Sequence, residues 1–279
     1  MTRGFSWPVI VCAVLALPRA AIAGPPPTTE DDALFQSAVA ALQGGRPGEA
    51  IASFEALADH GVVDATVSFD RALAYVARVR VGGEQRGDLG EAAHGLLEAK
   101  DLTSDRTLAS EATRALGLVR SEVARRRAHA GEPVEFDPGM ALGPTFLRLL
   151  PEDGWALLAL IGSVVLGLSL FVTRRASERR LRIGAAVTAA VATLLLVVGT
   201  ASTFAARDRR MTVTPGVVVT AGARPTDERG LVIPSAPVVP EAAEVEIVGP
   251  RAGWVHVRWG NLLAWLPGGS VRAIGDVAR

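Results

Sequence analysis

The sequence predicts a multidomain membrane protein in which an all-α domain, a two-helix transmembrane hairpin and a small all-β domain follow one another. Three observations lead to this fold class. The first half of the chain has apolar residues at helical spacings, the middle contains two long stretches without an ionisable residue, and short apolar runs separated by proline and glycine follow Arg210. With 279 residues and 49% hydrophobic content, the chain has room for several units and is apolar for a soluble protein.

The first 23 residues have the anatomy of a secretory signal peptide. Arg3 supplies the charged start, Phe5–Leu17 form an apolar core, and Ala21-Ile22-Ala23 form a small-residue cleavage site. Arg19 just before this site leaves an uncleaved anchor as the alternative. Either version exports the domain that follows.

The only cysteine, Cys12, lies inside the apolar core of this segment. A cleaved chain therefore has no thiol for a disulfide or for thiolate catalysis. Lipidation of Cys12 is disfavoured because Val11 precedes it and the apolar run continues after it.

Residues 24–130 are expected to form a helical domain, because apolar residues recur every three or four positions. Gly44-Gly45 ends one helix, Pro47 occupies a favoured first-turn position, and Gly61 ends the next. The expected helices cover residues 32–43, 47–59, 65–79, 89–102 and 104–128.

An internal repeat relates four pairs of residues that are each 42 positions apart, namely Gly45 with Gly87, Ala50 with Ala92, Phe54 with Leu96, and Leu57 with Ala99. The pattern resembles the tetratricopeptide family, whose period is about 34 residues. The resemblance implies packing roles between helices for Ala50, Phe54, Ala92, Leu96 and Ala99. It also implies a surface that binds peptide segments or partner helices of other envelope proteins. An unrelated helical bundle is the alternative.

Residues 131–153 form a linker to two predicted transmembrane helices, 154–173 and 183–206, each long enough to cross a hydrocarbon layer of about 30 Å. The loop between them, residues 174–182, carries five arginines: Arg174, Arg175, Arg179, Arg180 and Arg182. Positively charged loops stay in the cytoplasm, so residues 24–130 and 207–279 are both expected in the periplasm of a bacterial inner membrane.

Small residues on both spans suggest close packing of the two helices. Ala159, Ser163 and Gly167 recur every fourth residue, and the second span begins with Gly184-Ala185-Ala186. Such a ridge lets two helix backbones approach each other in lipid. The alternative is that these residues only reflect an alanine-rich composition.

Residues 207–279 are expected to form the all-β domain. The expected strands cover residues 216–220, 231–233, 244–248, 254–259 and 262–266. Gly260-Asn261 is a two-residue turn between two alternating segments, which predicts a β-hairpin.

The order Gly253-Trp254-Val255-His256-Val257, Gly260, Trp265-Leu266-Pro267 and Val271–Ile274 resembles a bacterial SH3 domain, although Ala264 stands where that family has glycine. The resemblance implies a small barrel. Trp254 and Trp265 are candidate ligand contacts for a proline-rich or cell-wall peptide. The alternative is that Trp254, Trp259 and Trp265 mainly fill the core of a small domain.

Composition and motifs argue against several function classes. Residues 24–153 contain 13 basic and 21 acidic residues, a net charge of −8 that disfavours nucleic acid as a partner. The four histidines are scattered, and neither a metal-binding spacing nor a phosphate-binding loop occurs. We therefore expect a protein that is not an enzyme and binds no cofactor or metal.

The complete order of signal peptide, repeat-like helices, arginine-linked spans and SH3-like segment resembles the tetratricopeptide/SH3 proteins of the Bacteroides aerotolerance (Bat) operon. This resemblance implies an envelope scaffold that works with von Willebrand factor A proteins and a MoxR-type ATPase in stress tolerance. The alternative function is a cell-wall sensor or attachment factor that binds peptidoglycan through its SH3-like domain.

Overall fold

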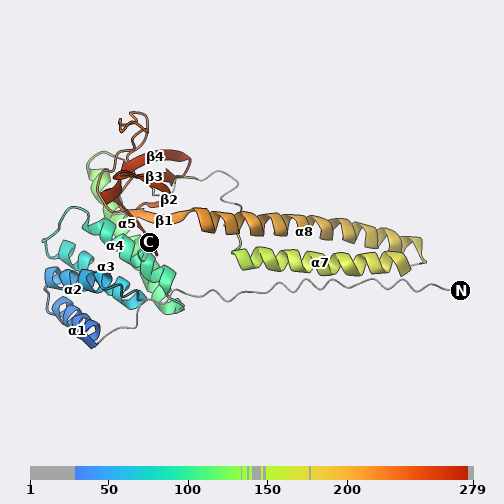
Figure 1. Cartoon of the computed structure of the whole chain (residues 1–279), viewed down its shortest axis with the longest axis horizontal. Coiled ribbons are helices and arrows are strands. Elements are labelled where there is room, and N and C mark those ends of the chain that lie inside the picture. Colours follow the sequence, from blue (N-terminus) through green and yellow to red (C-terminus); the bar gives the residue numbers. More distant parts are fainter. Residues whose placement is uncertain are drawn as a thin grey trace.

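The computed structural model of the chain describes residues 29–132, 134–136, 138–139, 146, 149–175 and 177–275. The predicted signal peptide, residues 1–23, lies outside this part of the chain. Figure 1 shows a head of helices and strands at one end of a long pair of helices. Both helices of the pair start or end beside the head, and their connection lies at the far end (Figure 1).

Five helices form the first part of the head. They are α1 (Thr29–Gln43), α2 (Pro47–Asp59), α3 (Ala65–Arg80), α4 (Asp88–Leu102) and α5 (Arg106–His129). Each boundary agrees with the sequence-based expectation to within three residues. Local chemistry explains the agreement, since Pro47 opens α2 and the Asp64 carboxylate caps α3 by accepting hydrogen bonds from two backbone N–H groups.

The repeat noticed in the sequence corresponds to similar local structure in α2 and α4. Gly45 and Gly87, which precede these helices, have φ angles of +72° and +100°, a region that favours glycine. The other six residues of the repeat are all at most 1% exposed: Ala50, Phe54, Leu57, Ala92, Leu96 and Ala99. Their common burial places the repeated positions between packed helices.

The long helices α7 (Glu152–Arg175) and α8 (Arg179–Thr212) pack against each other along their length. A Cβ atom at Gly162 would lie 2.8 Å from the Leu196 nitrogen, and one at Gly199 would lie 2.7 Å from the Ala159 nitrogen. The two backbones therefore approach closely because glycine occupies both positions. The order of these contacts shows that the helices are antiparallel.

The predicted small-residue ridge is wrong in detail. Ala159 does lie at the contact, but Ser163 and Gly167 are exposed, and a Cβ atom at Gly167 or Gly184 would meet nothing within 4 Å. The buried positions of α7 are instead Trp155, Gly162 and Ser169, spaced seven residues apart. Seven residues complete two turns of a slightly supercoiled helix, so this spacing keeps one seam facing the partner helix.

The outer surface of this helix pair is apolar. Both helices are long and apolar enough to cross a membrane, and about 11% of each apolar window is buried. Large exposed side chains include Leu157, Leu160, Val164, Leu168, Val187, Val191 and Leu194. An exposed apolar surface of this kind is unfavourable in water and favourable in lipid.

A five-stranded antiparallel sheet completes the head. Its strands are β1 (Thr214–Val218), β2 (Glu244–Arg251), β3 (Trp254–Trp259), β4 (Leu262–Pro267) and β5 (Val271–Ala273), in the order β4-β3-β2-β1-β5. The predicted hairpin is confirmed, since Trp259 pairs with Leu262 across Gly260-Asn261. The expected strand at 231–233 is wrong, because only Val232 forms an isolated bridge, to Thr226.

One hydrophobic core contains residues of both the helices and the sheet, a contact that the sequence does not predict. Val217, Ala242 and Ile274 belong to the same buried cluster as the side chains of α1–α5, whereas Val218 belongs to the separate core of the sheet. Successive residues of a strand point to opposite faces, so β1 is buried on both sides. The five helices and the sheet thus form one packed head.

Candidate functional site at the junction of helices and sheet

The junction between α4 and the sheet brings two distant parts of the backbone into close contact. A Cβ atom at Gly90 would lie 2.4 Å from the Val219 Cα atom, and one at Gly87 would lie 2.7 Å from the Val219 carbonyl oxygen. Atoms this close overlap sterically, so only glycine allows the chain after β1 to rest on the backbone of α4. A glycine inside a helix costs about 1 kcal/mol relative to alanine, which here is offset by the approach of the sheet.

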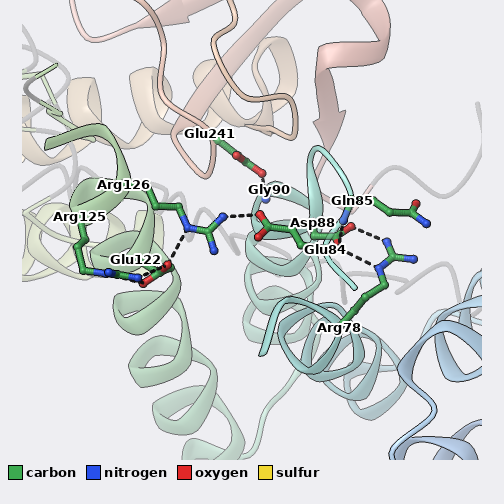
Figure 2. Close-up of polar contacts among 9 residues, drawn as sticks. All are labelled: Arg78, Glu84, Gln85, Asp88, Gly90, Glu122, Arg125, Arg126 and Glu241. Atoms are coloured by element: carbon green, nitrogen blue, oxygen red, sulfur yellow. Dashed lines mark hydrogen bonds and ion pairs between the residues drawn. The ribbon is translucent and has the colours of Figure 1, made fainter. Parts of the chain in front are cut away.

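A carboxylate from the sheet side caps the start of α4. Oε1 of Glu241 accepts a hydrogen bond of 2.7 Å from the backbone N–H of Gly90, as Figure 2 shows. The first N–H groups of a helix have no partner within the helix and favour a negative charge. Burial raises the pKa of the Glu241 carboxyl, while the Gly90 hydrogen bond acts in the opposite direction.

Several ion pairs surround this cap (Figure 2). Asp88, the first residue of α4, accepts a hydrogen bond of 2.9 Å from Nε of Arg78 on α3. Arg126 on α5 pairs with Glu84 in the loop before α4, and its Nε donates to Glu122 at 2.7 Å. These pairs hold the Glu84–Gly87 loop between two helices and thereby fix the start of α4.

A cavity of about 370 Å³ lies beside the cap. Side chains and backbone from three regions line it, including Leu89, Val123, Arg126, Gly222 and Glu241. Its walls are mainly apolar, and its charged groups are of both signs. The cavity therefore shows no preference for a cation or an anion.

The other end of the junction brings β5 onto α2 and α4. Nε of Arg272 lies 3.0 Å from Oε1 of Glu91, and one terminal nitrogen of the same guanidinium lies 3.8 Å from Glu55. Nε2 of His94 lies 2.9 Å from the backbone oxygen of Ala273. Sequence reasoning singled out none of these residues for a site.

A buried arginine supports this end from inside the helices. Arg71 on α3 donates a hydrogen bond of 2.7 Å to Oε2 of Glu98 on α4, and the Ser68 hydroxyl donates to the same oxygen at 2.8 Å. Arg71 and Ser68 are each 5% exposed. The pair therefore holds α3 and α4 in one relative position.

The two candidate ligand tryptophans lie together on the outer face of the sheet. Trp254 on β3 and Trp265 on β4 are both partly exposed, and the ring of His256 stacks on Trp265 at 4.5 Å between centroids. Trp259 points the other way and is 4% exposed. The expectation that tryptophans fill the core therefore holds for Trp259 and not for the other two.

The segment before α7 is attached to the same sheet. Nε1 of Trp259 donates to the Phe136 carbonyl oxygen at 3.3 Å, and the Phe136 ring lies 5.7 Å from the Arg120 guanidinium. A Cβ atom at Gly260 would lie 2.4 Å from the Pro138 oxygen. This contact ties the linker to the β3–β4 turn and to α5.

The arginines that predict topology lie at the far end of the helix pair. Arg174 and Arg175 end α7, and the remaining three, Arg179, Arg180 and Arg182, begin α8. All five are exposed. Within the described part of the chain, no group of three or more His, Cys, Asp or Glu side chains is arranged to hold a metal ion.

Two patterns in the sequence indicate the close packing of the residues at the junction. Gly87 and Gly90 lie three residues apart at the start of a helix, which indicates close approach of another backbone. Apolar and polar residues do not alternate in the run Val217-Val218-Val219, as they would in a strand with one solvent-exposed face. This indicates burial on both faces. Neither signal identifies the partner surface.

We expect the buried His94 to make the junction sensitive to acid. Burial lowers its pKa below the ordinary value of 6.5, and the charges around it are Glu98, Arg71 and Arg272. Its Nε2 contacts Ala273, while Nδ1 is buried without a hydrogen-bond partner among the described residues. Because the folded pKa is lowered, the stability that neutral His94 contributes is present above pH 6.5 and is lost as the pH falls through the folded pKa.

We expect His94→Gln to remove this acid sensitivity, because an amide can still donate to the Ala273 oxygen and does not ionise in this range. Docking is measured by cross-linking cysteines placed at positions 120 and 244 with a bifunctional thiol reagent, in a Cys12→Ser background. The natural side chains at these positions form an ion pair, with 2.8 Å between the Arg120 guanidinium and the Glu244 carboxylate. The ratio of cross-linking in the natural chain to that in His94→Gln should fall between about pH 8 and 5.5. A constant ratio would contradict the assignment.

Comparisons with models of known families, with characterised proteins and with solved structures found no match to this chain.

Proposed function

We propose that the protein is a non-enzymatic scaffold, anchored in the bacterial inner membrane by α7 and α8, that holds its head in the periplasm and binds other envelope proteins. The observation that carries this proposal is the junction itself, in which α4 packs directly on β1 and Val219. The two halves of the head come from opposite ends of the chain and must lie on one side of the membrane to touch.

The helix pair supports the membrane anchor. α8 has 34 residues, which corresponds to about 51 Å at 1.5 Å per residue and exceeds a hydrocarbon layer of about 30 Å. The part of α8 beyond the hydrocarbon layer includes Arg207 and Asp208. Only one residue, Val213, separates the end of α8 from β1. The sheet is therefore held near the membrane surface.

The arginines support the orientation. Five guanidinium groups at the far end of the hairpin resist translocation, so that end is proposed to face the cytoplasm and the head the periplasm. The even number of spans agrees with a head assembled from both flanking segments. The proposed partners are those that the Bat resemblance implies, namely von Willebrand factor A proteins and a MoxR-type ATPase that act in stress tolerance.

Labelling of single cysteines tests the orientation. In a Cys12→Ser background, Ser110→Cys on α5 and Glu228→Cys in the sheet domain both place an exposed thiol on the head, and Ser177→Cys places one in the loop. A membrane-impermeant maleimide applied outside the cytoplasmic membrane should label positions 110 and 228 and leave position 177 unlabelled until the membrane is broken. The reverse pattern would overturn the orientation.

Isolation of the complex tests the scaffold role. The full chain, solubilised in mild detergent after cross-linking in cells, should retain stoichiometric membrane partners. Recovery of the chain alone under these conditions counts against a scaffold.

A cell-wall attachment factor is the second candidate, because Trp254, His256 and Trp265 share one partly exposed face of the sheet. Aromatic side chains on a strand pair suit extended or proline-rich ligands. Sedimentation of the full chain with purified sacculi tests this, with Trp265→Ala as the variant and Leu263→Ala on the same face as its control. The full chain is needed because Val217 and Ile274 pack into the core of the helices.

A further inference from the structure

The end of the sheet domain lies on the helices in the manner of a bound extended peptide. β5 pairs through one edge with β1, where Gly216 faces Ala273, and its other edge faces α4. The Ile274 N–H donates to Pro215 on the β1 side, whereas the Ala273 oxygen is directed to His94. One backbone edge of this short segment is thus bound by a side chain of the helical domain.

Two side chains of the segment anchor it. Arg272 lies between the carboxylates of Glu91 and Glu55 at 3.0 and 3.8 Å. Ile274 is 9% exposed and belongs to the hydrophobic core of the helices. The cation of Arg272 is therefore received by carboxylates on α2 and α4, and the branched apolar side chain of Ile274, two residues later, by the core that the helices form with β1.

The receiving groups, Glu55, Glu91 and His94, are held in place by the helices themselves, and we call them the β5-docking site. The Tyr75 hydroxyl donates to Glu55 at 2.9 Å. Burial raises the pKa of the Glu91 carboxyl, which the Arg272 guanidinium opposes. A carboxylate this buried gains from a cationic partner, so the site favours ligands with a basic side chain.

We infer that the β5-docking site is a peptide-recognition site occupied by the chain's own residues 272–274, and that its partner in trans is an extended protein segment with Arg or Lys two residues before Ile, Val or Leu. The net charge of −8 on residues 24–153 favours such a basic segment over an acidic one. Release of the sheet from α4 would expose the site, so the β5 contact acts as an autoinhibitory lock.

Tethering explains why residues 272–274 occupy the β5-docking site in the isolated chain. A covalently linked segment competes at an effective concentration of about millimolar, well above that of a free partner. The contact that β5 itself makes is also small, since β5 has three residues and Arg272 keeps 43% of its side chain exposed. A partner that binds more tightly than the internal segment can therefore replace it.

The test uses the full chain in detergent and a fluorescent capped peptide with the sequence of residues 268–275. The variant Arg272→Ala with Ile274→Ala removes the internal anchors, and Arg258→Ala on the outer face of β3 is its control. We expect the double variant to bind the peptide at least tenfold more tightly than the natural chain or the control. Adding Glu55→Gln and Glu91→Gln should abolish this gain, and a peptide with Glu in place of the arginine should not bind.

Equal affinity of the natural chain and the double variant, or equal binding of the charge-reversed peptide, would overturn the inference. If the double variant loses its helical circular dichroism signal, Gly90→Ala compared with Gly117→Ala decides the same question, because Gly90→Ala loosens the sheet and keeps the β5-docking site intact.

The inference extends the proposed scaffold role. Its readout in detergent is independent of membrane orientation, so failure of one is distinguishable from failure of the other.

Discussion

Replacing Gly90 with alanine should release the sheet from the helices while leaving the helices folded. The new Cβ atom would lie 2.4 Å from the Val219 Cα atom and 2.7 Å from its carbonyl carbon and oxygen, all of them backbone atoms that no rotamer change can move. Overpacking by one methylene typically costs about 1–3 kcal/mol, and a clash between two backbones lies at the upper end or beyond. We expect cross-linking between positions 120 and 244 to fall at least fivefold.

Gly117 on α5 provides the matched control, since a Cβ atom there would meet nothing within 4 Å. Both substitutions raise helix propensity by about 1 kcal/mol, so only the contact with Val219 distinguishes them. Gly117→Ala should keep full cross-linking and melt at the same or a higher temperature. Equal cross-linking in the two variants would mean that the sheet does not rest on α4 at Gly90.

Replacing Arg71 with methionine should destabilise the helical part of the head by about 3–5 kcal/mol, the usual cost of removing one partner from a buried ion pair. Arg71 is 5% exposed. Among the described residues, Arg71 and Ser68 donate side-chain hydrogen bonds to Oε2 of Glu98, so the loss of Arg71 leaves only the Ser68 hydroxyl. Methionine is of similar length, so lost packing contributes little. The free energy of unfolding in urea, followed by circular dichroism in detergent, measures the change.

Arg46→Met is the control for this substitution, because Arg46 and Glu49 form an ion pair whose side chains are 58% and 63% exposed. Such surface pairs contribute about 0–1 kcal/mol. The double variant Arg71→Met with Glu98→Gln should recover part of the stability, since no buried charge then remains unpaired. If the two single variants lose equal stability, Arg71 has no special role in joining α3 to α4.

Helix boundaries and the β-hairpin were predictable because their signals are local. Pro47, Asp64 and Gly45 act on the backbone within a turn of their own position, and Gly260-Asn261 favours a two-residue turn because Gly260 readily adopts a positive φ. The burial of the repeated residues, such as Ala50 and Ala92, also follows from a period that the chain itself displays.

The seam of the helix pair was predicted incorrectly for a physical reason. Small residues are frequent on every face of α7, so counting them does not identify the face that contacts α8. Gly162 lies on the contact and Gly167 does not, a distinction that depends on which face packs against Ala192 and Leu196. The candidate site was missed on similar grounds, since Glu241 and Gly90 are 151 residues apart in the chain.

The sequence by itself determined the segments of this protein: five helices, two long apolar helices and a β-hairpin, each specified by periodicity, turn residues and the absence of charge. Only the tertiary structure decided that the helices and the sheet form one head. That contact joins the segments before α7 and after α8 through Gly90, Val217 and Glu241. Periodicity identifies a buried face, but shape and charge complementarity in three dimensions select the surface that covers it.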